Sequence, residues 1–135
     1  MVATNQSGLG RGLFKHTALE AIHDTLRAGV ESAGGRLGGI FYCPHRPEDD
    51  CACRKPRPGL LAAIEAHYGT TIAGSVLVGD SLCDVALARA TDCRPLLVLT
   101  GNGRDTAARL AEADEAVTQF VDLGAVARWL LDERR

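Results

Sequence analysis

The sequence has few aromatic residues, no long apolar run and little net charge, and each absence removes a class of protein. Aromatic residues make up 4% of the chain, and 17 acidic side chains stand against 15 basic ones. A formal charge of −2 gives no general attraction to nucleic acid or to an acidic membrane surface. No apolar stretch approaches the roughly 20 residues of a membrane-spanning helix. We therefore expect neither nucleic acid nor a membrane as partner.

Internal repeats, low-complexity tracts and linkers are also missing from the sequence. Its 135 residues are enough for one hydrophobic core, so we predict a single domain over residues 1–135. Nothing near the first residue is typical of a secretory signal. Because reduced cysteines fit a reducing compartment, we predict a cytoplasmic location.

Four metal-ligand side chains lie within eleven residues, as the pairs Cys43-x-His45 and Cys51-x-Cys53. Residues i and i+2 of an extended segment point the same way, so each pair can form a two-pronged clamp. The five residues between the pairs, which include Pro47, can fold the clamps together around one ion. Three thiolates and one imidazole are the ligands of a closed structural zinc site. Soft thiolates also disfavour magnesium and calcium.

Two other interpretations of this segment exist. The cysteines can be ordinary buried residues beside a surface histidine, since cysteine is commonly buried. A disulfide is the second interpretation, but Cys51 and Cys53 are too close in sequence for an easy bridge. The dense grouping of ligand-type residues among Pro, Asp and Arg is unlike a core segment, so the sequence favours zinc.

Short apolar stretches alternate with helical patterns along the chain. The expected helices cover residues 17–33, 58–68, 82–90, 105–111 and 123–131. One strand is expected to end just before Thr4. The other expected strands cover residues 40–42, 75–79, 96–99 and 116–117. This alternation is typical of a parallel sheet covered on both faces. We predict an α/β fold, a Rossmann-like three-layer sandwich.

The first long helix carries an expected start signal and an expected buried face. Thr17 and Glu20 form a capping-box pattern at its beginning. Apolar residues then recur at helical spacing and are expected to face inward: Leu19, Ile22, Leu26 and Val30.

Polar groups follow three of the expected strands, namely Thr4-Asn5, the cysteine-rich segment with Arg54-Lys55, and Asp80. In parallel sheets, ligands bind beyond the carboxyl ends of the strands. We therefore expect these groups to converge on one ligand.

Thr4 and Asn5 begin a glycine-rich turn and can donate hydrogen bonds to a phosphoryl oxygen. The glycines allow close backbone approach. An ordinary solvated turn before a helix uses the same residue types, so that alternative stays open.

Arg54 and Lys55 place two adjacent cations after the cysteine pair. Arginine can grip a phosphate or sugar hydroxyls with its planar fork, and lysine can act as a point charge on a phosphoryl group. The alternative is that the pair only offsets the negative charge of a three-thiolate zinc site. Asp80 offers a hard oxygen ligand that suits magnesium beside phosphate. For Asp84, one turn further on, helix capping is the favoured role.

Three motifs then carry a family resemblance: TNQSGLGRG, CPHRPEDDCACRKPRPGL and VGDSLCD. In this order they resemble the zinc-containing branch of the haloacid dehalogenase-like (HAD-like) phosphatases. The chain is most similar to the D-glycero-D-manno-heptose 1,7-bisphosphate 7-phosphatase family, with the histidinol-phosphate phosphatases as near kin. The resemblance covers the whole chain.

The resemblance implies a role for each candidate residue. Thr4 and Asn5 would contact the transferring phosphoryl group, Lys55 would stabilise it, and Arg54 would recognise the substrate. The substrate-binding residues would be Thr4, Asn5, Gln6, Ser7, Arg54 and Lys55. Asp80 would bind catalytic Mg²⁺, and structural Zn²⁺ would be held by Cys43, His45, Cys51 and Cys53.

Two departures from the family pattern stand out. Ser81 occupies a position where some heptose phosphatases carry lysine. The family also opens with a strand that ends in Asp-x-Asp, the nucleophile and the general acid/base, and no Asp-x-Asp occurs in these 135 residues. The adjacent Asp49 and Asp50 cannot replace it on spacing. We therefore expect the first strand-helix unit of the HAD-like domain to be missing, with sheet edges unpaired and apolar surface exposed.

The resulting hypothesis is a phosphoric monoester hydrolase by family, acting on a small sugar phosphate. Its reaction would remove the 7-phosphate of the heptose bisphosphate through an aspartyl-phosphate. We expect this chain to be inactive alone, because the nucleophile is absent, through either a start set too late or a real loss. The alternatives are a histidinol-phosphate phosphatase relative, a non-catalytic zinc-binding remnant, or a half that completes a partner chain.

Overall fold

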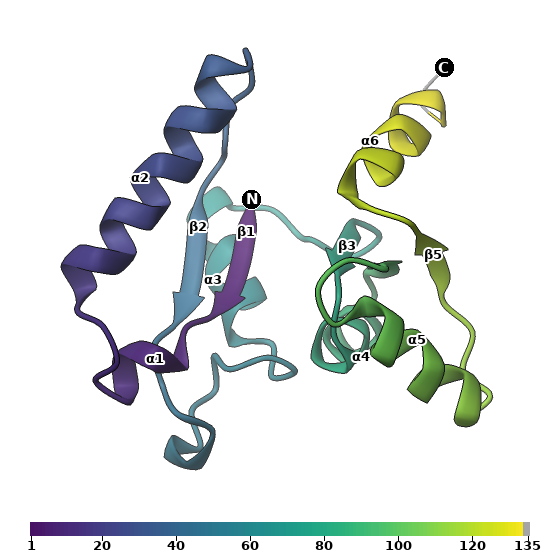
Figure 1. The fold of residues 1–135 in the computed structure, drawn as a ribbon, viewed down its shortest axis with the longest axis horizontal. Helices are drawn as coiled ribbons and strands as arrows, with labels where there is room; N and C mark the ends of the chain where they lie inside the picture. Colours follow the sequence, from purple (N-terminus) through teal and green to yellow (C-terminus); the bar gives the residue numbers. More distant parts are fainter. Residues whose placement is uncertain (134–135) are drawn as a thin grey trace. The chain divides into compact units, whose positions relative to one another are not determined.

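The computed structural model describes residues 1–133, which form two compact units divided at Thr70. Each unit has its own parallel sheet with helices beside it (Figure 1). Within the described residues, none of the helices combines the length and the apolar character needed to cross a membrane.

The first unit contains a two-stranded sheet. Its elements, in chain order, are β1 (Val2–Asn5), α1 (Ser7–Gly10), α2 (His16–Ser32), β2 (Ile40–Cys43), the 3₁₀ turn η1 (Pro47–Asp49) and α3 (Gly59–Tyr68). Strands β1 and β2 are parallel, and their register places Asn5 opposite Cys43. The last residue of β1 therefore lies beside the first predicted zinc ligand.

Helices α2 and α3 cover opposite faces of this sheet. Tyr42 of β2 contacts His23 of α2, with ring centroids 5.5 Å apart. Its neighbour Phe41 contacts His67 of α3 at 5.8 Å. Successive side chains of a strand point to opposite faces, so the two helices enclose the sheet between them.

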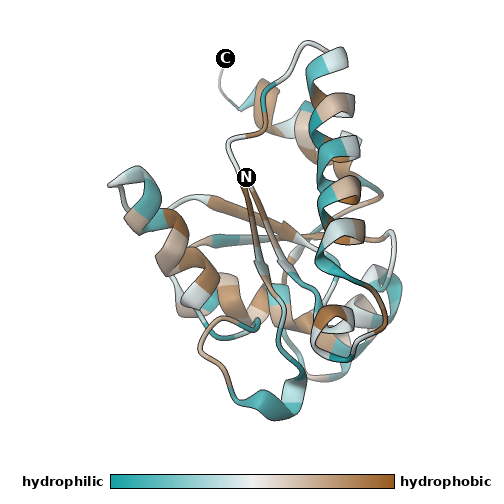
Figure 2. Cartoon of the chain, turned by 90° about the vertical axis from the view of Figure 1, so that its left-hand side faces the viewer, coloured by the Kyte–Doolittle hydropathy of each residue, from teal (hydrophilic) through white to brown (hydrophobic). Residues whose placement is uncertain are grey.

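The buried face of α2 differs from the predicted one. Leu19 is buried as expected, but Ile22 is 61% exposed and Leu26 is 41% exposed. His23 is buried instead, four residues after Leu19, because it packs on Tyr42. Hydrophobic and hydrophilic residues are accordingly mixed around this helix (Figure 2).

The predicted capping box of α2 is wrong. The helix begins at His16, and its N-cap is Lys15, which makes no side-chain capping bond. The N–H of Ala18 donates to the carbonyl of Lys15 at 3.0 Å. Thr17 is therefore already inside the first helical turn and cannot act as the cap.

The second unit contains a three-stranded parallel sheet in the order β3-β4-β5. Its elements are β3 (Val76–Gly79), α4 (Leu82–Ala90), β4 (Arg94–Val98), α5 (Gly103–Glu112), β5 (Thr118–Phe120) and α6 (Leu123–Asp132). The expected strand at 116–117 is wrong, because the ladder with β4 begins at Thr118, opposite Leu96.

The core of this unit lies on both faces of β4. On one face Leu97 packs with Val85 of α4 and Leu110 of α5. On the other face, Leu96 and Val98 pack with a residue of α6, Val126. Helices α4 and α5 thus cover one side of the sheet and α6 covers the other. The second unit therefore has three layers: helices, sheet and helix.

The predicted fold class, α/β with parallel strands and flanking helices, is confirmed. Among the described strands, β1 pairs only with β2 and β3 pairs only with β4. Each of these two strands therefore has one unpaired edge within its sheet. A single domain over residues 1–135 stays a prediction.

Candidate functional site

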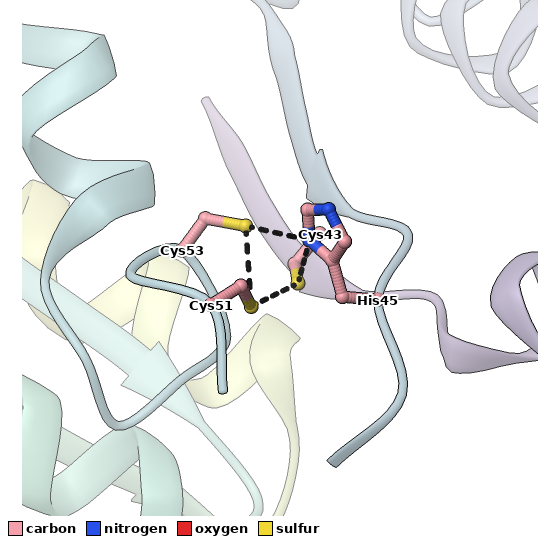
Figure 3. Close-up of side chains that lie close together, drawn as sticks. All are labelled: Cys43, His45, Cys51 and Cys53. Atoms are coloured by element: carbon pink, nitrogen blue, oxygen red, sulfur yellow. Dashed lines mark hydrogen bonds between the residues drawn. The ribbon is translucent and has the colours of Figure 1, made fainter. Parts of the chain in front are cut away.

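The structure brings the four predicted zinc ligands together. The ligand atoms of Cys43, His45, Cys51 and Cys53 all lie within 4.8 Å of one another. Figure 3 shows the four side chains pointing toward a common centre. Strand β2 ends at Cys43, so the sheet fixes the first ligand directly.

The spacing of these atoms fits a tetrahedral zinc ion. Zinc-sulfur bonds of about 2.3 Å and zinc-nitrogen bonds of about 2.0 Å place tetrahedral ligands roughly 3.5 to 3.8 Å apart. The sulfur of Cys51 lies 3.5 Å from that of Cys43 and 3.7 Å from that of Cys53. Nδ1 of His45 lies 3.5 Å and 3.3 Å from the sulfurs of Cys43 and Cys53. These donors therefore suit zinc in both number and geometry.

The two thiols of the second pair differ in acidity. For Cys51, burial opposes ionisation, but hydrogen bonds from Cys43, from the backbone of Arg54 and from Cys53 lower the pKa to about 7. For Cys53, burial and its hydrogen bonds with Cys43 and Cys51 raise the pKa to about 12. Zinc binding requires the thiolate form, so a bound cation would have to offset the cost of ionising Cys53.

Ion pairs fold the segment between the two ligand pairs. Arg46 donates from its backbone N–H to Asp49 Oδ2 at 2.8 Å and from Nη2 to Asp49 Oδ1 at 2.9 Å. The Arg46 guanidinium lowers the pKa of the Asp49 carboxyl. Asp50 follows with a φ of 50°, which reverses the chain toward Cys51. Arg57 pairs with Asp50 and also donates to the carbonyl of Cys51 at 2.6 Å.

Neighbouring backbone fixes the cysteine-rich loop on two sides. The N–H of Gly59, at the start of α3, donates to the carbonyl of Ala52 at 3.0 Å. The N–H of Gly10 donates to the carbonyl of Pro44, also at 3.0 Å. A Cβ at Gly10 would lie 2.7 Å from that carbonyl oxygen. The glycine-rich segment after β1 thus lies directly against the loop.

Lys55 extends from this loop to β1. Its Nζ donates to the carbonyl of Ala3 at 3.0 Å, and its backbone is hydrogen-bonded to the side chain of Asn5. Thr4 stands between those two contacts. Asn5 and Lys55 therefore lie together in the first unit, with Thr4 next to them in β1, and their role in binding stays a prediction.

Arg54 has a buried nitrogen with no partner in the described part of the chain. Its Nη1 is shielded from solvent and makes no hydrogen bond among residues 1–133. A buried guanidinium N–H without an acceptor is costly, because it has lost water and gained nothing in exchange. An anion is the partner that such a group suits.

The TNQS segment differs in detail from the expectation. Thr4 and Asn5 belong to β1 itself rather than following it, and Ser7 begins α1. Gln6 donates from Nε2 to the hydroxyl of Thr4 at 3.2 Å.

Asp80 lies in the second unit, directly after β3. Its Oδ2 accepts the backbone N–H of Asn102 at 2.8 Å and the side-chain Nδ2 of Asn102 at 3.2 Å. Thr106 donates its hydroxyl to the Asp80 carbonyl at 2.8 Å. No hydrogen bond within residues 1–133 involves Oδ1, so this hard oxygen suits a cation such as magnesium.

Asp84 caps α4, as predicted. Its Oδ2 accepts the backbone N–H of Ser81 at 3.1 Å and the Ser81 hydroxyl at 2.6 Å. Ser81 is the N-cap and accepts the N–H of Asp84 in return, which completes a capping box. Ser81, the residue that departs from the family pattern, therefore starts the helix.

Asn102 and Thr106 were not identified from the sequence. The signal that could have found Asn102 was the turn Thr100-Gly-Asn-Gly103 at the end of β4. A Cβ at Gly101 would lie 2.3 Å from Asp80 Oδ2, so this turn needs glycine there. The hydrogen bond between this turn and the Asp80 carboxylate joins residues 22 positions apart, so only the folded structure reveals it.

Comparison with known proteins supports the family resemblance predicted from the sequence. A family model described as HAD-hydrolase-like matches residues 52–123. The D-glycero-beta-D-manno-heptose-1,7-bisphosphate 7-phosphatase of Pseudomonas aeruginosa is 50% identical over 130 residues, which are 96% of this chain and 72% of that protein. The enzyme of the same name from Bordetella bronchiseptica is 48% identical over 133 residues, 98% of this chain and 74% of its own.

Solved structures match in the same way. The D,D-heptose 1,7-bisphosphate phosphatase of B. bronchiseptica, crystallised with magnesium and phosphate, gives a TM-score of 0.87 at 47% identity and covers 96% of this chain and 72% of that one. The corresponding phosphatase of Burkholderia thailandensis gives a TM-score of 0.70 at 32% identity, with 96% and 73% covered. These matches confirm the predicted resemblance.

Proposed function

We propose that this chain, which belongs to the D-glycero-beta-D-manno-heptose-1,7-bisphosphate 7-phosphatase family of HAD-like hydrolases, binds a heptose bisphosphate at its 7-phosphate. The reaction class is hydrolysis of a phosphate monoester. The substrate is a small sugar phosphate. The names of the relatives support this substrate, and they do not favour histidinol phosphate.

One observation supports the phosphate-binding role most strongly, namely the pair of cations that follows the four-ligand cluster. Lys55 reaches β1 beside Thr4, and Arg54 holds a buried nitrogen without a partner among the described residues. In the proposed site Lys55 and Thr4 contact the phosphoryl oxygens, and Arg54 recognises the substrate. Gln6 orients the Thr4 hydroxyl through its own hydrogen bond.

The proposed metal at the cysteine cluster is structural zinc. All four donors are protein atoms, so the site has no position for a catalytic water. Its ligands begin at the end of β2 and finish one residue before Arg54. The zinc site would therefore keep Arg54 and Lys55 in place and take no part in the chemistry. Its ligands would be Cys43, His45, Cys51 and Cys53.

The proposed catalytic metal is magnesium, with Asp80 as a ligand. A bound divalent cation neutralises charge on the phosphoryl group, which is the main need in phosphoryl transfer. Asn102 fixes one carboxylate oxygen of Asp80 and leaves the other for the cation. The complex of the B. bronchiseptica phosphatase with magnesium and phosphate supports this choice of metal.

The carboxylate nucleophile has no candidate in these residues. An aspartyl-phosphate route needs an aspartate beside the phosphoryl group, and the 135 residues contain no Asp-x-Asp. We propose that the chain, as given, binds the substrate without turning it over.

The proposed zinc site fits a reducing compartment. All five cysteines are free thiols in the structure. Because a zinc site needs thiolates rather than disulfides, we propose the cytoplasm. We also propose that residues 1–135 form one HAD-like domain.

Calorimetric titration of the zinc- and magnesium-loaded chain tests the proposed function. The ligands are the heptose 1,7-bisphosphate, the heptose 1-phosphate that lacks the 7-phosphate, and histidinol phosphate. We expect the bisphosphate to bind most tightly, and Arg54→Ala to weaken it at least tenfold. Equal affinity for the 1-phosphate, or tighter binding of histidinol phosphate, would overturn the proposal.

A further inference from the structure

Asn5 uses both ends of its carboxamide on a single residue. The backbone N–H of Lys55 donates to Asn5 Oδ1 at 3.0 Å, and Asn5 Nδ2 donates to the Lys55 carbonyl at 3.3 Å. The two residues are 50 positions apart in sequence. Such a pair of bonds reproduces the pairing of neighbouring strands, with a side chain in place of one backbone.

Asn5 lies at a position where this contact can fix the cysteine-rich loop. It lies opposite Cys43, the first zinc ligand, in the register of β1 and β2. The cysteine-rich loop begins at the end of β2. Asn5 therefore joins the other end of this loop to the neighbouring strand, β1. Lys55 is held to β1 at two points, its backbone by Asn5 and its Nζ by the Ala3 carbonyl.

Two fixed points orient the lysine side chain. A lysine has four rotatable side-chain bonds, and a free one samples many rotamers. With its backbone fixed against Asn5, the side chain runs along β1 past Thr4 to Ala3. The ammonium is thereby kept at the backbone of Ala3, the residue that precedes Thr4.

We propose that Asn5 is a positioning residue, which acts on the phosphate through Lys55 rather than contacting the phosphate itself. This inference deepens the proposed function and rests on it. It also revises the role implied by the family resemblance, in which Asn5 meets the phosphoryl group directly. The Asn5 carboxamide uses its oxygen and one of its two N–H donors on Lys55.

A double-mutant cycle separates the two roles. Inorganic phosphate is titrated into the zinc-loaded chain and followed by ³¹P NMR, for the unmodified chain, Asn5→Ala, Lys55→Ala and the double variant. If Asn5 acts through Lys55, the two substitutions are not additive. We expect Asn5→Ala to weaken phosphate binding about five- to tenfold alone and to have no further effect when Lys55 is already alanine. An equal loss in both backgrounds would mean that Asn5 touches phosphate, and would overturn the inference.

A second measurement decides the inference without phosphate. Hydrogen exchange at the Lys55 amide should be at least about tenfold faster in Asn5→Ala, because this N–H loses its acceptor. Asn5→Asp keeps the acceptor and should retain most of the protection, so it serves as the matched control. If Asn5→Ala does not fold, Asn5→Leu, which fills similar space but also lacks the acceptor, replaces it and should show the same faster exchange. Zinc content should stay equal in all of them.

The two measurements also separate failure of the inference from failure of the proposed function. If the unmodified chain binds no phosphate while the Lys55 amide follows the predicted exchange pattern, the phosphate role fails and the positioning contact stands. If the amide exchanges equally fast in the unmodified chain and Asn5→Ala, the positioning role is wrong whatever the phosphate titration shows.

Discussion

Asn102 donates two hydrogen bonds to one oxygen of Asp80, at 2.8 Å from its backbone and 3.2 Å from its side chain. The bonds cross from the turn after β4 to the end of β3. They fix the rotation of the carboxylate, so that the other oxygen has a defined direction. Mutation of a group that orients a metal ligand in this way typically lowers metal affinity by about 10- to 100-fold.

Asn102→Ala should therefore weaken divalent-metal binding at Asp80. It removes the side-chain bond and leaves the backbone bond, so we expect a loss of about tenfold. Titration with Mn²⁺ and paramagnetic broadening of the amide signals of residues 80–82 measure it. Asp80→Asn should abolish the same broadening, and Arg104→Ala, beside the turn, serves as the control. Unaltered broadening in Asn102→Ala would contradict the orienting role.

Cys51→Ser should cut the zinc content of the purified chain from one ion to well below one. Serine keeps the size of the side chain but removes a soft thiolate ligand. Metal analysis of the protein measures the stoichiometry. Cys83→Ser, which lies outside the four-ligand cluster, is the matched control and should keep its zinc. The zinc assignment fails if Cys51→Ser binds as much zinc as the control.

Phosphate release from the heptose bisphosphate should be negligible for the 135-residue chain. The reason is chemical, because the covalent route needs an aspartate nucleophile that the sequence does not supply in an Asp-x-Asp pair. A colorimetric phosphate assay with magnesium present measures it, with the P. aeruginosa relative as positive control. Robust magnesium-dependent turnover by this chain would show that another residue acts as nucleophile.

Leu97→Ala should destabilise the second unit by about 2 to 5 kcal/mol, since it leaves a cavity in the core. Leu97 is fully buried between Val85 and Leu110. Urea unfolding followed by the fluorescence of Trp129, the only tryptophan, reports on this unit. Leu131→Ala, at a position 65% exposed, should change stability by no more than about 0.5 kcal/mol. Similar effects of the two substitutions would contradict the described core.

Local patterns predicted most of the elements correctly. The helix expected at residues 82–90 matches α4, and the one expected at residues 58–68 ends where α3 ends, at Tyr68. The zinc ligands were also recognisable, since all four lie within one short segment. These features depend on residues that are close together in sequence, so local patterns were enough to predict them.

Features that depend on distant partners were missed. The buried face of α2 is set by Tyr42, which packs on His23 and leaves Ile22 exposed despite its apolar side chain. The last strand lies at 118–120 because β4 pairs there, not where hydropathy is highest. The contacts of Asn5 and Asn102 span 50 and 22 residues and leave no local pattern.

The two lysines of the chain, Lys15 and Lys55, allow the most direct test of the phosphate-binding loop. The measurement is the affinity of the zinc-loaded chain for the heptose 1,7-bisphosphate after replacement of either lysine by alanine. Both substitutions remove one positive charge, but only Lys55 follows the zinc ligands and reaches β1. We expect at least a tenfold loss for Lys55→Ala and little change for Lys15→Ala; equal affinities in the two variants would show that the loop lysine does not bind the phosphate.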